Sequence, residues 1–413
     1  MKLEKFSFGL GDRFGMEGSA QLKAVIKAQE MGIHFTPVWN KSNREHKLIH
    51  TTPADQRNSA DAAVKKMNWE KPYFVDADHI NSSSVSEFIE SCDFFTIDTA
   101  DLLAKVPEKA ILEQYLSSIQ LPFEQTEFGE YSFHFDRDFL TKFLNKYALA
   151  IDEVQNVYQT IKNSKNSIDF ITEVSMDEVD IPQNPAELFL ILFILFEKGI
   201  PVNTIAPRFS GRFNKGVDYV GDTKLFEKEF EADVLACKRI NEIFKTGQDV
   251  KLSIHSGSDK FAIYDAISSI ATKYNAGFHI KTAGTSWIEE VIGLALCGGE
   301  ALKVVKTIYS IALQRFDELA KPYEFVLDIR KEKLPTISEI GSWDADHFAR
   351  SLRHDQSDLL YNPDLRQLIH VAYKVAVEMG QDFYSLLGKH RDVIEEQVYT
   401  NIYNRHILKL FQK

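Results

Sequence analysis

The chain has 413 residues and a net charge of −12, with 44% hydrophobic and 12% aromatic residues. This acidic balance argues against non-specific nucleic-acid binding, which requires a basic surface, and the apolar content suffices for a large core. Three widely spaced cysteines indicate neither a disulfide framework nor a thiolate zinc site. The most apolar stretch, residues 188–196, is too short to span a membrane, and the first ten residues show no signal-peptide pattern. We therefore expect a cytoplasmic protein.

Short apolar runs alternate with helical patterns from the start of the chain. The predicted strands of this first part cover residues 6–10, 33–39, 73–79 and 94–98. The predicted helices between them cover residues 19–31, 59–69 and 84–92. A helix thus lies between each strand and the next, which is the pattern of a parallel sheet covered by helices.

The alternation pauses between about residues 100 and 140, where we expect an insertion with a hairpin around residues 128–131. A predicted helix over residues 139–162 follows the insertion, and the alternation of strands and helices then resumes. The later predicted strands cover residues 169–174, 202–209, 249–254 and 277–280, and the helices between them residues 184–198, 224–245 and 261–274. Eight alternations predict an α/β fold, a (β/α)8 TIM-type barrel over residues 1–320. Residues 321–413 are predicted to form a helical extension packed on the barrel.

Polar side chains stand at the ends of most predicted strands. They are Asp12, Arg13, Asn40, Asp78, His79, Asp98, Glu173, Arg208, His255 and His279. In a barrel of this kind the active site is built at the carboxyl ends of the strands. The alternative is that each residue belongs to a solvated loop. Polar groups at so many apolar strand ends favour a shared site at one barrel mouth.

Three of these residues are histidines from different strands: His79, His255 and His279. Imidazole nitrogens bind Zn, Mn, Fe, Co or Ni, and three protein ligands leave positions open for a substrate. Alone, each histidine is better explained as a hydrogen-bonded core or loop residue; together they predict a divalent metal site. A second Asp-Ala-Asp-His, at residues 344–347, is instead predicted to begin a helix with Asp344 as its cap.

An acidic side chain inside an apolar strand is costly unless it is paired or functional, and Glu173 is such a residue. An ion pair with a neighbouring strand is one explanation. The other is that Glu173 and Asp78 flank a substrate as acid and base. Substrate carboxylates could be bound by Arg208, with Arg13 or Lys260 as further candidates.

The turn that follows the eighth predicted strand, residues 282–286, is small and polar. In barrels, backbone N–H groups at this position often bind anions. We therefore include Thr285 among the predicted substrate-binding residues.

Several longer segments together resemble one known family, the tagaturonate/fructuronate epimerases of bacterial hexuronate breakdown. They are FGLGDRFG (8–15), DADH (76–79), FTIDTAD (95–101), TEVSMDE (172–178), PRFSGRFNKGVDYVGD (207–222), SIHSGSDKF (253–261), FHIKTAGTS (278–286) and RQLIHVAY (366–373). The resemblance implies a metal-dependent sugar-acid epimerase. It also implies that Asp78 is the proton acceptor, Glu173 the proton donor, and His79, His255 and His279 the metal ligands.

The two sugar acids of that family differ at a hydroxyl-bearing carbon β to the ketone. A proton on this carbon is not made acidic by simple enolisation, so retro-aldol cleavage and re-addition is the expected route, with a metal stabilising the enediolate. Three alternatives stay open: a ketohexose 4-epimerase, a class II-type metal aldolase, and a non-catalytic sugar-acid binding protein. The expected partner is a small sugar acid rather than nucleic acid or membrane, and the sequence allows a homo-oligomer.

Overall fold

Eight parallel strands close into a barrel in the computed structural model, which describes residues 2–103, 105–177, 181–245, 247–255, 259–282 and 285–411. The order around the barrel is β1-β10-β9-β8-β7-β4-β3-β2. The strands are β1 (Phe6–Gly11), β2 (Thr36–Ser42), β3 (Phe74–Ile80), β4 (Phe94–Asp98), β7 (Ile171–Ser175), β8 (Thr204–Ala206), β9 (Lys251–His255) and β10 (Phe278–Thr282). The predicted (β/α)8 TIM-type barrel is confirmed.

Helices cover the outside of the barrel. They are α1 (Gly18–Glu30), α2 (Asn43–Ile49), α3 (Pro53–Lys66), α5 (Arg137–Lys165), α6 (Pro185–Glu197), α7 (Thr223–Phe244) and α8 (Tyr264–Lys273). Helix α6 contains the most apolar stretch of the sequence, which is buried from Leu188 to Leu195. None of the helices within the described ranges combines the length and the apolar character that a membrane crossing requires.

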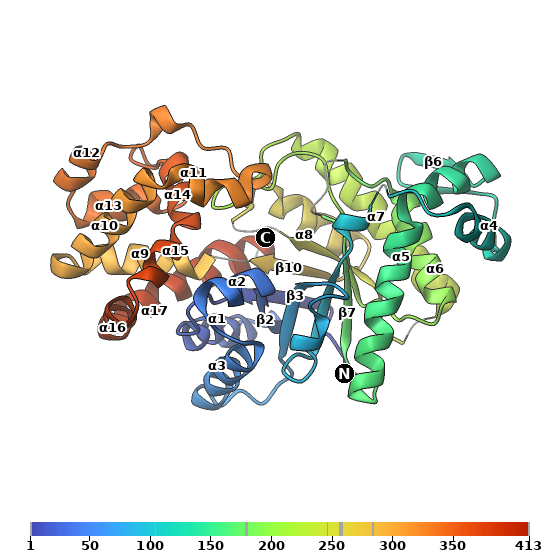
Figure 1. Cartoon of the computed structure of the whole chain (residues 1–413), viewed down its shortest axis with the longest axis horizontal. Coiled ribbons are helices and arrows are strands. Elements are labelled where there is room, and N and C mark those ends of the chain that lie inside the picture. The colour runs from blue at the N-terminus through green and yellow to red at the C-terminus, as the bar shows by residue number, and fades with distance from the viewer. Residues whose placement is uncertain are drawn as a thin grey trace.

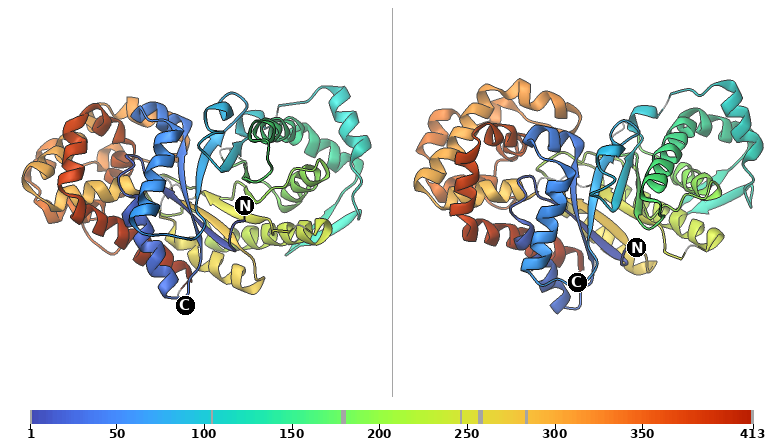
Figure 2. Two further views of the ribbon diagram at one scale, coloured as in Figure 1. Left: turned by 90° about the horizontal axis from the view of Figure 1, so that it is seen from below. Right: turned by 60° about the horizontal axis from the view of Figure 1, so that its bottom comes forward.

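Residues between β4 and α5 form the predicted insertion. It contains α4 (Lys109–Ser118) and the antiparallel hairpin of β5 (Gln125–Phe128) and β6 (Tyr131–His134), in which Phe128 pairs with Tyr131. In Figure 1 this insertion lies at one end of an elongated molecule, and the later helices lie at the other end, with the barrel between them. Both views in Figure 2 show the same arrangement.

A group of helices follows β10. They are α9 (Thr285–Leu296), α10 (Gly299–Gln314), α11 (Phe316–Ala320), α12 (Ile337–Ser342), α13 (Ala345–Leu352), α14 (Pro363–Val371), α15 (Tyr373–Glu378), α16 (Gln381–Lys389), α17 (Arg391–Thr400), a π-helix over Asn401–Ile407, and α18 (Leu408–Phe411). The last two return to the barrel, where the Phe411 ring lies 5.0 Å from that of Phe6 and 5.6 Å from that of Phe278. The proposed division of the chain at residue 320 stays a prediction.

The barrel interior is apolar at its amino-terminal end and polar above it. Val38, Phe74, Phe94 and Ile171 pack with Leu3 at the start of their strands. Side chains two residues apart on a strand point to the same face, so the next inward positions lie closer to the barrel mouth. These positions carry charged and polar side chains, which form the site described below.

Two predicted helices differ from the structure, each because of a local hydrogen bond. Helix α3 begins at Pro53 rather than at residue 59, because Thr52 and Asp55 form a capping box around a proline at its first turn. The predicted helix over residues 84–92 is only a 3₁₀ turn at Val85–Glu87. The Asn81 side chain accepts the Ser83 N–H there and favours a turn.

One buried ion pair joins the later helices to the segment after β9. Asp259 accepts hydrogen bonds from Arg366 on α14 and from His406 on the π-helix, both at 2.9 Å. We expect Asp259→Ala to lower the free energy of unfolding by about 3–5 kcal/mol, because it leaves the buried Arg366 charge uncompensated. Urea denaturation measures this loss. Glu113→Ala, which breaks an exposed pair with Arg137, should cause no measurable loss, and equal losses in both variants would contradict the expectation.

Candidate active site

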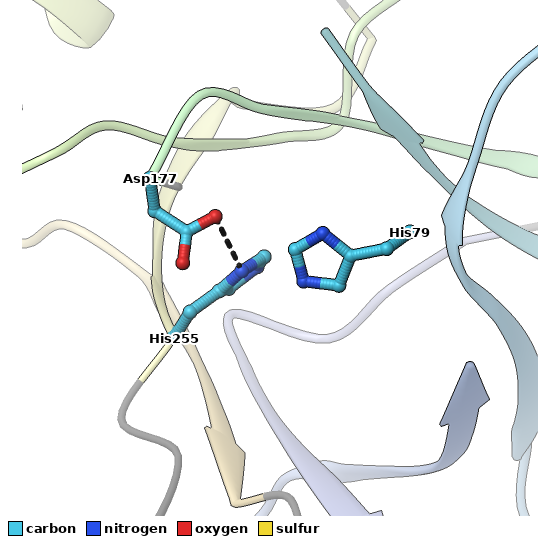
Figure 3. Close-up of side chains that lie close together, drawn as sticks. All are labelled: His79, Asp177 and His255. Atoms are coloured by element: carbon cyan, nitrogen blue, oxygen red, sulfur yellow. Dashed lines mark ion pairs between the residues drawn. The ribbon is translucent and has the colours of Figure 1, made fainter. Parts of the chain in front are cut away.

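Strand β3 ends in an irregularity that turns two consecutive side chains toward the barrel mouth. Its pairing with β4 shifts register between Ala77 and Ile80, and His79 has a φ of 52°, in the left-handed region. In a regular strand Asp78 and His79 would point to opposite faces. The irregular backbone instead brings the His79 ring to face His255 of β9 (Figure 3). Such costly backbone conformations gather at functional sites.

His79, Asp177 and His255 lie together at this mouth. Each offers one ligand atom, and these atoms all lie within 4.8 Å of one another. The His79 and His255 ring centroids are 5.3 Å apart, and His255 Nδ1 lies 3.1 Å from an Asp177 carboxylate oxygen (Figure 3). We refer to these three residues as the His–Asp–His group. Asp177 follows β7 by two residues, so the group joins three strands that are far apart in sequence.

Two further carboxylates each contact a ring nitrogen of one of these histidines. Asp98, the last residue of β4, lies 3.3 Å from His79 Nδ1. Glu173, inside β7, lies 2.8 Å from His255 Nε2. Metal-binding histidines commonly use their second nitrogen in this way, because the contact fixes the ring and its tautomer.

A lysine lies beneath the His–Asp–His group and contacts three carboxylates. Lys281 Nζ is 2.8 Å from Asp76, 2.9 Å from Asp78 and 2.8 Å from Glu173. It also donates a hydrogen bond of 2.6 Å to the Thr96 hydroxyl. All four partners are buried, and Lys281 itself is 3% exposed. The ammonium therefore compensates much of the negative charge that the barrel buries.

These contacts decide which carboxyl groups are ionised. Burial opposes ionisation of Asp78, but Lys281 and the two histidines outweigh it and lower the pKa of Asp78 to about 2. Burial likewise opposes ionisation of Glu173, yet Lys281 and His255 hold its pKa well below the usual range. Burial raises the pKa of Asp76 to about 7, against the attraction of Lys281. Asp78 and Glu173 are thus carboxylates at neutral pH.

The charges and donor atoms of this site fit a divalent cation. Two imidazoles and a carboxylate form a donor set that Zn, Mn, Fe, Co and Ni accept. Asp78 and Glu173 lie next to this donor set, and Lys281 supplies only one positive charge against them. Burial opposes protonation of His255, but Asp177 and Glu173 raise its pKa to about 9, so the surroundings of this ring favour a positive charge.

The third predicted histidine lies deeper in the barrel. His279 precedes Lys281 by two residues on β10, and its Nδ1 lies 2.8 Å from the Ser7 hydroxyl of β1. Its ring is fully buried beside Phe94, and burial lowers its pKa to about 3, so the imidazole is neutral. Among the described residues, its Nε2 has no hydrogen-bond partner. His279 is not part of the His–Asp–His group, and its role as a ligand stays a prediction.

The predicted carboxylate-binding cations contact protein groups. Arg13 lies 3.1 Å from Glu45 and stacks over Tyr373. The Arg208 side chain follows β8 and donates to the Gly211 carbonyl oxygen.

The other two predicted substrate-binding residues are Lys260 and Thr285. Lys260 Nζ is buried and donates to the carbonyl oxygens of Asn214 and Val217. Thr285 is the first residue of α9, and its side chain lies outside the described part of the structure. For all four residues, substrate binding stays a prediction.

Two residues of the site, Asp177 and Lys281, were not among those predicted from sequence. Asp177 stands two residues beyond the end of β7, where an acidic loop residue is common. Lys281 stands two residues after His279 on the same strand, so it shares the inward face. This spacing in the sequence indicates that the Lys281 side chain points into the barrel. It does not indicate that the ammonium reaches the opposite side.

The sequence matches the UxaE family, described as tagaturonate epimerase, over residues 1–412. A curated relative, the tagaturonate/fructuronate epimerase of Thermotoga maritima, is 30% identical over 417 residues. This alignment covers 97% of the chain and 80% of the relative.

The fold is also similar to solved structures of the fructuronate-tagaturonate epimerase UxaE of Cohnella laeviribosi. The native crystal structure aligns with a TM-score of 0.80 at 24% identity, and a glycerol complex with 0.81 at 23% identity. Each comparison covers 99% of this chain and 82% of the other. At this level of identity the comparison shows a shared fold.

Replacing members of the His–Asp–His group tests it as a metal site. We expect His255→Ala and Asp177→Ala each to lower the affinity for Mn²⁺, measured by equilibrium dialysis, by more than Asp98→Asn does. For Asp98→Asn we expect a loss of roughly 10- to 100-fold, because Asp98 only orients a ligand. The control is His347→Ala, which alters the second Asp-Ala-Asp-His, where Asp344 caps α13 as predicted. Unchanged affinity in His255→Ala would contradict the site.

Proposed function

Because the chain belongs to the UxaE tagaturonate epimerase family, we propose that it interconverts D-tagaturonate and D-fructuronate with the help of a divalent cation. The observation that best supports this proposal is the His–Asp–His group beside two ionised carboxylates, Asp78 and Glu173. A metal donor set next to two groups that can move protons is what retro-aldol chemistry on a hydroxy ketone requires.

His79 and His255 are the proposed metal ligands, as the sequence predicted, and Asp177 joins them. When bound, a divalent cation supplies Lewis-acid stabilisation of negative charge on the substrate. Asp98 and Glu173 hold the two imidazoles in place. The variant His279→Gln tests the remaining predicted ligand. If His279 binds the metal, this variant should lose as much affinity for Mn²⁺ as the variant Asp177→Ala.

The proposed reaction breaks and re-forms one carbon–carbon bond. Asp78, ionised at neutral pH, removes the proton from the hydroxyl on the carbon β to the ketone. The hydroxyl becomes an aldehyde while the electrons of the bond between the α and β carbons pass to the ketone side. The aldehyde then presents its other face, the bond re-forms, and the new alkoxide takes up a proton.

Glu173 is the proposed donor of that last proton, and its surroundings set a condition on this role. It is 0% exposed, and its oxygens accept hydrogen bonds from Thr204 and Thr96 while His255 and Lys281 lie within 2.8 Å. Glu173 is ionised at neutral pH, so it must take up a proton before it can act as the donor. Direct transfer from Glu173 also requires that one of these partners moves first. Asp78, which is 4% exposed, is less enclosed.

The contacts of two predicted substrate-binding cations favour a second candidate function. Arg13 and Lys260, which we predicted to bind the substrate carboxylate, contact protein groups instead. A neutral ketohexose would need no such cation, so a ketohexose 4-epimerase remains the alternative, together with a class II-type aldolase. Comparing the turnover of fructuronate with that of fructose distinguishes the proposed function from a ketohexose 4-epimerase. Trapping a released aldehyde distinguishes it from an aldolase.

Turnover of tagaturonate, followed by NMR with purified and metal-reconstituted protein, tests the proposal directly. We expect activity to vanish after chelation and to return with Mn²⁺ or another divalent cation. We expect Asp78→Asn to lower kcat by at least about 10²-fold, because the hydroxyl proton then has no base. The same variant should still bind Mn²⁺. Full activity in Asp78→Asn would contradict its role, and an inactive metal-loaded wild type would contradict the proposed function.

A further inference from the structure

Lys281 spans the barrel interior from one wall to the opposite one. In the strand order, three strands separate β10 from β4 in either direction around the barrel. The Lys281 ammonium nevertheless lies 2.6 Å from the hydroxyl of Thr96 on β4. An extended lysine is long enough for this crossing and is 3% exposed, so the cation is held inside the barrel.

At the opposite wall the ammonium lies between the two carboxylates of the proposed reaction. Asp78 belongs to β3 and Glu173 to β7, which are the neighbours of β4 on its two sides. Lys281 Nζ lies 2.9 Å from Asp78 Oδ1 and 2.8 Å from Glu173 Oε1. One cation therefore fixes both carboxylates with respect to each other, although no strand pairing joins β3 to β7.

The neighbouring strand leaves space for this lysine. A Cβ atom on Gly9 of β1 would lie 3.0 Å from the Lys281 Cα and 3.1 Å from its Cγ. It would also lie 3.3 Å from the Asn40 side-chain oxygen. These separations are tighter than ordinary van der Waals contact, so a side chain on Gly9 would displace the lysine stem.

We propose that Lys281 is a positioning residue for the reaction, which sets the separation and direction of the Asp78 and Glu173 carboxylates, and that Gly9 is a glycine so that Lys281 can lie there. The inference rests on the proposed function, in which these two carboxylates move the substrate proton. The carboxylates lie on strands that pair with β4 rather than with each other, and the ammonium contacts both side chains directly. Misplacement of catalytic groups by about 1 Å can cost on the order of 10²-fold in rate.

Two variants test the proposal in different ways. Lys281→Met keeps most of the length of the side chain and removes its charge. Gly9→Ala keeps the lysine and adds a methyl group against its Cα and Cγ atoms. We expect kcat for tagaturonate to fall about 10²-fold in Lys281→Met and about 10-fold in Gly9→Ala. KM should change less than threefold. The rates are measured at saturating Mn²⁺, because a displaced Glu173 also releases the His255 ring that it contacts. Crystal structures of both variants should show the two carboxylates displaced from their wild-type positions.

The matched control is Lys251→Met. Lys251 is another buried lysine on a barrel strand. It lies at the amino-terminal end of β9 and donates to the Glu4 carbonyl oxygen. Its replacement removes a buried ammonium without touching Asp78 or Glu173, so we expect kcat to stay within threefold of wild type.

The outcomes separate this inference from the proposed function. If Lys281→Met keeps kcat at saturating Mn²⁺, or if KM rises as much as kcat falls, Lys281 does not act by positioning. If Lys281→Met fails to fold, Gly9→Ala decides, and a wild-type rate in that variant overturns the proposal. If the wild type does not act on tagaturonate, the proposed function fails. The crystal structures then still decide, since carboxylates that stay in place without Lys281 contradict its positioning role.

Discussion

The polar interior of the barrel depends on compensation of buried negative charge. Asp76, Asp78 and Glu173 lie inside a strand wall where an unpaired carboxylate would be strongly destabilising. Lys281 contacts all three, and the histidines above them lie within reach of further carboxylates. The excess of negative charge that remains is what makes a cation favourable at this mouth. Fold stability and the proposed metal binding thus depend on the same charged side chains, so we expect a substitution that alters one to alter the other.

The strand ends could be predicted from the sequence because their signal is local. Apolar runs that end in polar residues recur with the βα rhythm, and the barrel topology then brings their ends together. For this reason the sequence pattern correctly predicts that His79 and His255 lie at one mouth. Helix α6 and the hairpin of β5 and β6 follow from similarly local patterns.

The features that were not predicted depend on contacts across the barrel or on backbone irregularity. Alternation along β3 would send Asp78 and His79 to opposite faces, and only the left-handed backbone at His79 directs both toward the mouth. The reach of Lys281 to β4 depends on the barrel diameter and on the space that Gly9 leaves. Asp177 reaches the two histidines of the His–Asp–His group through the path of the chain after β7, which residue types do not specify. Sequence patterns therefore identified strand ends better than the ligands themselves.

The contact between Phe411 and the first barrel strand has a consequence for how the protein folds. Helices α17 and α18 and the π-helix lie against α1 and α8, where they cover the barrel wall near β1 and β10. Until residue 411 has left the ribosome, the rings of Phe6 and Phe278 lack this cover and stay open to water. The cover of this part of the barrel wall is therefore completed only after the later helices have been synthesised. Such pairing of early and late segments slows folding and leaves apolar surface exposed to aggregation in the meantime.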